Sequence, residues 1–84
     1  MISRDKVYCG KEQKIILEIQ NGRYSILMEE KDKYDSKRYL VEDIAKEYRV
    51  ALSIFEEICS LEIDGENLRE AVYELLSKRN MLNV

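Results

Sequence analysis

One turn constrains the fold of this chain more than any other feature. Asn21-Gly22 lies between two segments, Lys14–Gln20 and Arg23–Glu29, in which every second residue is apolar. Asn and Gly both accept the positive φ angles of a type I′ turn, which joins antiparallel strands through two residues. The turn predicts a β-hairpin with a wholly apolar face. The predicted register pairs Gln20 with Arg23, Ile19 with Tyr24, Glu18 with Ser25, Leu17 with Ile26 and Ile15 with Met28.

The segments beside the hairpin give weaker signals. Lys6–Cys9 is predicted to form a short first strand that returns through Gly10–Gln13. Lys31–Lys37 is polar and is predicted to be an exposed connection. The N-terminal part, residues 1–30, is therefore expected to be a hairpin or a three-stranded meander.

Helical periodicity dominates the region Arg38–Cys59. One apolar stripe recurs at steps of three and four residues. Its members are Val41, Ile44, Ala45, Tyr48, Leu52, Phe55, Ile58 and Cys59. Val50 and Ile54 fall on the far side, so the helix is either covered on two faces or broken near Arg49. We expect a continuous or only kinked helix, because Glu47–Ser53 contains no Gly, Pro or Asn.

The alternative is two helices separated by a turn. Asp43–Ile58 resembles the helix-turn-helix family at its buried positions, which are Ile44, Ala45, Tyr48, Val50, Phe55 and Ile58. The sequence has Arg49 where that family usually has glycine. The resemblance implies a DNA-binding transcriptional regulator. The second helix, however, exposes Glu56 and Glu57 and offers no Arg, Lys, Asn or Gln to read base edges.

The last element is an amphipathic helix over Glu66–Asn80. Its apolar face consists of Leu68, Ala71, Val72, Leu75 and Leu76, and Asp64 is the predicted N-cap. The expected fold is α+β: a small antiparallel sheet of two or three strands packed against two or three C-terminal helices. The chain length of 84 residues predicts a single domain, residues 1–84. The helical part of this domain is expected over residues 38–80.

The residue inventory argues against an enzyme. The chain has no histidine, so it lacks Ser-His and Cys-His pairs and an imidazole base. Its three glycines are isolated and form no phosphate-binding loop. Two distant thiols, Cys9 and Cys59, cannot complete a structural zinc site. We therefore expect no catalytic residues, no cofactor and no metal. The polar N-terminus and the absence of a long apolar run predict a soluble, cytoplasmic protein with no membrane contact and reduced thiols.

Charge is distributed unevenly. Met1–Leu40 has nine basic and seven acidic residues, net +2, whereas Val41–Leu76 has three basic and ten acidic residues, net −7. Solvation of helix surfaces is one explanation. The other is an acidic surface that binds a basic protein and disfavours direct nucleic-acid contact. The candidate partner-binding residues are Glu42, Asp43, Glu47, Leu52, Ile54, Glu56 and Glu57.

The expected function is that of a non-enzymatic regulator or inhibitor that binds a protein. A basic nucleic-acid-binding protein such as a nuclease is one such partner, and phages and mobile elements encode small acidic inhibitors of this kind. The alternatives are the helix-turn-helix regulator and a structural dimerisation module, in which a homodimer covers the second apolar side of the helix.

Overall fold

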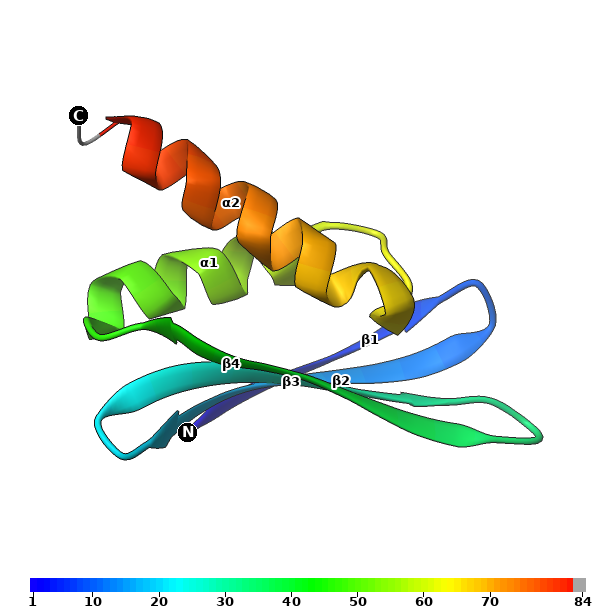
Figure 1. Ribbon diagram of the computed structural model, residues 1–84. Coiled ribbons are helices and arrows are strands. Elements are labelled where there is room, and N and C mark those ends of the chain that lie inside the picture. Colours follow the sequence, from blue (N-terminus) through cyan, green and yellow to red (C-terminus); the bar gives the residue numbers. More distant parts are fainter. Residues whose placement is uncertain (83–84) are drawn as a thin grey trace.

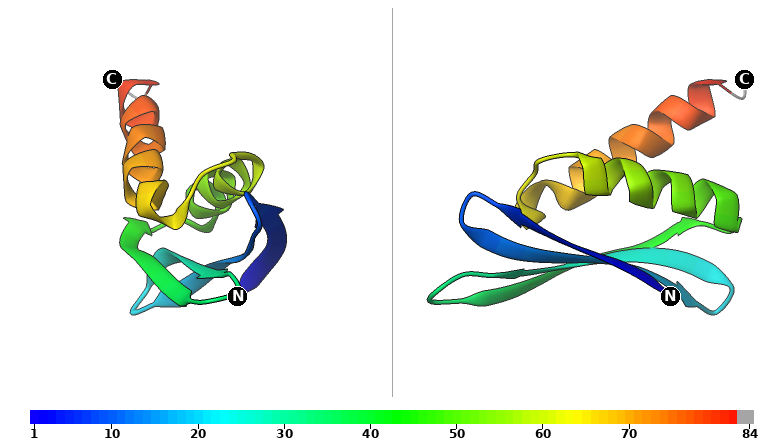
Figure 2. Two further views of the ribbon diagram at one scale, coloured as in Figure 1. Left: turned by 90° about the vertical axis from the view of Figure 1, so that its right-hand side faces the viewer. Right: turned by 180° about the vertical axis from the view of Figure 1, so that it is seen from behind.

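A computed structural model describes residues 1–82 of the chain. In this range a four-stranded antiparallel sheet is followed by two α-helices. The elements are β1 (Ile2–Tyr8), β2 (Lys11–Gln20), β3 (Arg23–Lys31), β4 (Ser36–Ala45), α1 (Tyr48–Ser60), a short 3-10 helix η1 (Gly65–Asn67) and α2 (Leu68–Leu82). Figures 1 and 2 show both helices on the same face of the sheet, here called the inner face; the opposite one is the outer face. The predicted α+β class is confirmed, with four strands instead of two or three.

The central hairpin has the predicted register at every pair. β2 and β3 pair from Gln20 and Arg23 through to Glu12 and Lys31. Asn21 and Gly22 have φ angles of 53° and 76°, as a type I′ turn requires. Turn chemistry and side-chain alternation therefore specify the same register, and this part of the fold follows from local sequence.

β1 is longer than predicted. It runs over Ile2–Tyr8 and pairs with Lys11–Leu17 of β2. The connecting turn at Cys9-Gly10 repeats the conformation of the central hairpin, with φ angles of 49° and 77°. Lys11–Gln13 therefore belong to the second strand and not to a connection.

The main correction concerns Arg38–Ala45, which was predicted to be helical. This segment lies in β4 and pairs with β3, so residues 41–58 form neither one helix nor a helix-turn-helix. Asp43 has φ 57° beside a register shift, which marks a β-bulge. The bulge lets Val41 and Ile44 both face the core, a spacing of three residues that imitates a helix. The helical part begins at Tyr48, ten residues after the predicted start at 38.

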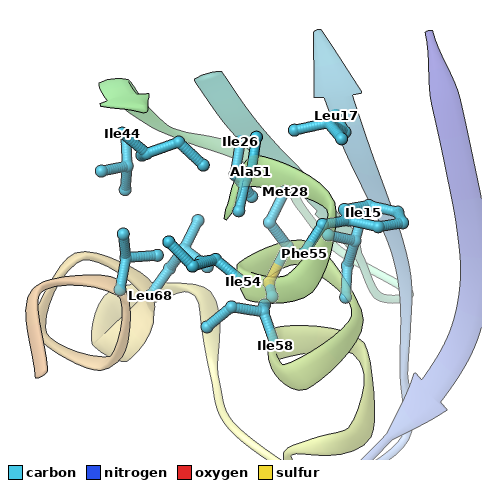
Figure 3. Packing of buried hydrophobic residues seen from close by; sticks show 12 residues of the cluster. Ile15, Leu17, Ile26, Met28, Ile44, Ala51, Ile54, Phe55, Ile58 and Leu68 are labelled. Carbon is cyan, nitrogen blue, oxygen red and sulfur yellow. The ribbon is translucent and has the colours of Figure 1, made fainter. Parts of the chain in front are cut away.

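The core lies between the inner face of the sheet and the two helices. Figure 3 shows Phe55 of α1 among strand residues such as Ile15 and Met28, all of them fully buried. Ile54 faces Leu68, so α1 contacts the sheet on one side and α2 on the other. Cys59 is packed against the cluster, as a small apolar residue would be.

The structure confirms the last predicted helix as α2. It begins at Leu68 and not at Glu66, because Gly65–Asn67 form a 3-10 turn. Asp64 precedes this turn, but its side chain makes no capping hydrogen bond there. The C-terminal half of α2 rises away from the sheet (Figures 1 and 2). Neither helix within residues 1–82 is long and apolar enough to cross a membrane.

Candidate functional site

The solvent-facing side of α1 carries two neighbouring carboxylates. The buried side of the helix is formed by Ala51, Ile54, Phe55 and Ile58. Because these residues recur at helical spacing, Glu56 and Glu57 are turned outward, and both are exposed. The geometry of the core therefore fixes the direction of this acidic pair.

One of the two carboxylates also joins the helices. Arg79 of α2 donates a hydrogen bond to Oγ of Ser53 and lies 3.6 Å from Oε1 of Glu57. The Glu57 side chain keeps 49% of its surface exposed. Glu57 therefore has a structural contact. A substitution of Glu56, on the same surface, is the better test of a role in binding.

α2 and η1 extend the acidic surface. Glu66, Glu70 and Glu74 are exposed along their solvent-facing side. Tyr73 is also exposed there, and the Arg69 guanidinium lies 6.0 Å from the centre of its ring, within the range of a cation–π contact. A large aromatic side chain within a charged surface is a common feature of protein-binding sites.

The helical layer as a whole is acidic. Its exposed carboxylates are Glu56, Glu57, Glu62, Glu66, Glu70 and Glu74, and its exposed cations between residues 48 and 79 are Arg49, Arg69 and Lys78. We call these six carboxylates the acidic helical surface. They lie on α1 (Glu56 and Glu57), on the loop and 3-10 turn that follow it (Glu62 and Glu66) and on α2 (Glu70 and Glu74), and α1 and α2 are adjacent in space. Both helices lie on the inner face of the sheet (Figure 2). The resulting potential favours cationic partners and disfavours phosphates.

The structure separates the candidate residues predicted from the sequence. Glu56 and Glu57 lie together, and Leu52 is half-buried on the flank of α1. Glu47 is exposed just before α1. Asp43, in the bulge, forms an ion pair with Arg23 at 3.2 Å. Glu42 lies beside the inward Val41 and therefore projects from the outer face of the sheet.

Ile54 is the candidate that the structure contradicts. Its side chain is fully buried, in contact with the core cluster. The predicted helix began at Arg38, so the strand residues Val41 and Ile44 set the wrong phase for the apolar stripe. With α1 starting at Tyr48, Ile54 joins the buried side and cannot contact a partner.

A polar cluster inside the fold was missed by sequence reasoning. Oε2 of the buried Glu30 accepts hydrogen bonds from Nε2 of Gln13 at 2.8 Å and from the Gly65 amide at 2.7 Å. Lys11 lies 3.2 Å from Asp64, and this hydrogen bond raises the pKa of the Lys11 ammonium, assisted by the charge of Glu30. A signal was available, because Gln13 and Glu30 share the strand parity of Ile15 and Met28.

The cluster holds the loop before α2 against the sheet and leaves little room for a ligand. The adjacent cavity, of about 70 Å³, is lined by Lys11, Glu30, Lys31, Asp32, Asp35, Lys37, Tyr39 and Glu66. Pockets that bind small molecules are several times larger. The arrangement is therefore suited to positioning the loop.

A larger trough, of about 660 Å³, lies over the outer face near the β1–β2 turn. Its charged side chains alternate in sign across the strands. Asp5 is paired in register with Lys14, Lys14 with Glu29, and Glu29 with Arg38. Opposite charges at neighbouring strand positions stabilise one another, so the row has a structural role within the sheet.

The thiol of Cys59 is poorly suited to chemistry. Burial raises the pKa of the Cys59 thiol, which keeps it protonated and unreactive near neutral pH. Within residues 1–82 there is no group of three or more His, Cys, Asp or Glu side chains placed to hold a metal ion.

Comparison of the chain with protein-family models, with curated proteins and with solved structures gave no significant match.

Proposed function

We propose that this chain is a non-enzymatic regulatory protein that binds a basic protein through its acidic helical surface. The observation that carries the proposal is the clustering of exposed carboxylates on α1, η1 and α2, with few cations between them. Such a surface accelerates association with a positively charged partner and selects against acidic ones.

The outer face of the sheet has a different charge pattern from the helical layer, and this difference favours the helical layer as the binding surface. Its charges alternate between strands, and Arg38 lies 3.5 Å from Glu29. These side chains are already matched by their neighbours. On the helical layer, Glu57 contacts Arg79 but Glu56, Glu70 and Glu74 project outward without such an alternating pattern.

Direct binding to DNA has less support. The resemblance to the helix-turn-helix family depended on a helix over Asp43–Tyr48, whereas Asp43–Ala45 ends strand β4. The exposed side of α1 presents carboxylates, which a phosphate backbone repels. A nucleic-acid-binding protein remains the kind of basic partner that we favour, because its own binding groove is cationic.

The test is capture of a partner by the purified protein, followed by charge reversal. Wild-type protein is immobilised, bound proteins from a source lysate are identified by mass spectrometry, and the affinity of the purified candidate is measured at rising salt. The Glu56→Lys/Glu74→Lys variant removes carboxylates from both helices without touching the Glu57–Arg79 contact. Its control, Glu12→Lys/Glu18→Lys, makes the same charge change on the outer face and leaves the Asp5–Lys14–Glu29–Arg38 row intact.

We expect the partner to be basic, its affinity to fall above about 0.15 M salt, and its association rate to drop in the helical variant only. Equal binding by both variants, or binding that is insensitive to salt, contradicts the proposal.

A further inference from the structure

The sheet ends in two strands, β1 and β4, that have a neighbour on one side only within residues 1–82. An edge strand presents unpaired backbone N–H and C=O groups to any strand that can lie beside it. The side chains at each edge determine whether a second copy of the same chain can pair there.

Two copies of β1 cannot pair favourably. When identical antiparallel strands meet across a two-fold axis, the residue at the axis faces its own copy. The middle of β1 is Arg4, Asp5 and Lys6, so each central axis places two like charges directly opposite one another. Pairing about Asp5 also sets Arg4 against Lys6 of the second copy. The charges of β1 therefore protect this edge.

β4 has the opposite character. Leu40 lies opposite Leu27 in register, and Leu27 lies opposite Ile16, so these residues form an apolar row across the outer face. Ile16 and Leu27 are buried, whereas Leu40, at the edge, keeps 40% of its surface exposed. The apolar row therefore ends at a partly exposed leucine on the open edge of the sheet.

The charged row beside it also ends at β4. It runs through Asp5, Lys14 and Glu29 to Arg38, alternating in sign at each strand. Arg38 is 68% exposed. The next strand position would continue the alternation only if it held a carboxylate.

A two-fold axis at Leu40 satisfies both rows at once. Leu40 then faces its own copy, Tyr39 faces Val41 of the second copy, and Arg38 faces Glu42 of the second copy. Moving the axis to Tyr39 instead places Arg38 opposite Leu40. The Asp43 bulge, with φ 57°, ends the straight part of the strand just after Glu42, so the pairing spans Arg38–Glu42.

The direction of α2 bears on this arrangement. The backbone of Gly65 lies against the Tyr39 ring, and α2 continues from there toward the Ala45 end of β4 and away from the sheet (Figures 1 and 2). The two-fold axis sends α2 of the second copy in the opposite direction. The two α2 helices therefore lie on opposite sides of the axis.

We infer that the chain forms a symmetric homodimer through antiparallel pairing of β4 about Leu40, which creates one continuous eight-stranded sheet, twice the four strands of each copy. The Arg38–Glu42 pairs, formed twice by symmetry, set the register. The inference does not depend on the proposed function, because Arg38, Leu40 and Glu42 lie outside the acidic helical surface.

The test exploits the two charge pairs. In an Arg38→Glu chain both members of each pair are acidic, and in a Glu42→Arg chain both are basic, so each variant repels its own copy. Mixed together, the two chains restore both opposite-charge pairs. Oligomeric state is measured by sedimentation velocity from micromolar to millimolar concentration, and circular dichroism verifies that each chain is folded.

We expect wild type to dimerise, each variant alone to dimerise roughly thirtyfold more weakly or worse, and the equimolar mixture to form a heterodimer. Monomeric wild type at all concentrations, undiminished dimers of either variant, or failure of the mixture to associate each overturns the inference.

A second comparison does not require Arg38 to be altered. Leu40→Lys places two cations on the axis and should abolish dimerisation, whereas Val7→Lys changes an exposed apolar residue at the β1 edge and should leave it intact. Equal behaviour of these two variants also overturns the inference.

Discussion

The amide of Gly65 donates a hydrogen bond to Oε2 of Glu30, at 2.7 Å, and so fixes the start of η1 to the inner face of β3. The same oxygen accepts a hydrogen bond from Gln13, whose amide also donates to the carbonyl oxygen of Ile63 at 2.9 Å. A single buried carboxylate therefore connects two strands with the loop that leads from α1 to α2.

Removing this carboxylate should be costly. Glu30→Ala leaves the Gly65 amide and the Gln13 side chain without their shared acceptor in a buried place, and should destabilise the fold by about 3 kcal/mol in urea unfolding. Glu30→Gln keeps one acceptor oxygen and should cost less. The control is Glu29→Ala, which breaks a surface ion pair and should cost under about 1 kcal/mol. Equal losses for Glu29→Ala and Glu30→Ala would refute this account.

Gly65 is required for a steric reason. Its φ is not in the left-handed region, but a Cβ there would overlap the Tyr39 ring. Gly65→Ala should therefore destabilise the protein by about 2 kcal/mol, as overpacking does. In a Tyr39→Ala background the same change should cost little, and a double-mutant cycle measures the difference. Additive effects would show that the ring is not the obstacle.

Gly22 presents the reverse case. A Cβ at this position meets nothing within 4 Å, but φ is +76°. Gly22→Val should cost about 1–2 kcal/mol through the backbone alone, because a β-branched residue resists positive φ. Thermal unfolding of Gly22→Val and Gly22→Asn checks the cause, since Asn tolerates this conformation and should cost less.

Lys6, on β1, stabilises the C-terminal end of α1. Its ammonium donates hydrogen bonds to the carbonyl oxygens of Cys59, at 3.0 Å, and Leu61, at 2.6 Å, and the last turn of α1 contains no basic residue of its own. Lys6→Met retains the apolar stem but loses these hydrogen bonds and the favourable positive charge at the helix C-terminus. We expect it to lower the free energy of unfolding by about 1 kcal/mol. Chemical denaturation should show a smaller loss for Lys14→Met on the outer face.

Asp32 makes the β3–β4 turn sensitive to acid. Its carboxylate accepts hydrogen bonds from the amides of Tyr34 and Asp35, both at 2.8 Å, and these bonds lower the pKa of Asp32. Because the folded pKa lies below the unfolded value of about 3.9, the stabilisation is present above that value and is lost as pH falls through the folded pKa. NMR titration should show the Tyr34 and Asp35 amides shifting together with the Asp32 carboxyl. An Asp32→Asn variant should lack that transition.

The elements predicted correctly are those specified by neighbouring residues. Asn21-Gly22 sets both turn type and register, and the apolar spacing of α2 is uninterrupted. β4 could not be found in the same way, because the bulge at Asp43 breaks the two-residue alternation. The resulting spacing of Val41 and Ile44 imitates the first turn of a helix.

That misassignment also affected the candidate site. The false helix start placed Ile54 on a free surface, whereas Glu56 and Glu57 are exposed in either phase. Arg49, at the turn position of the helix-turn-helix alternative, lies in the first turn of α1. The Glu30 cluster depends on contacts between residues up to 53 positions apart, such as Lys11 and Asp64, which local patterns do not specify.

The order of the strands along the sheet has a consequence for folding of the chain. Each strand pairs with the one before it, so the sheet can assemble from hairpins that are local in the sequence, before α1 has packed against it. Until Phe55 arrives, the apolar inner face that includes Ile15, Ile26 and Met28 has no cover. Packing of α1 and α2 therefore covers an apolar surface that the paired sheet alone would leave open to chaperones and to other unfolded chains.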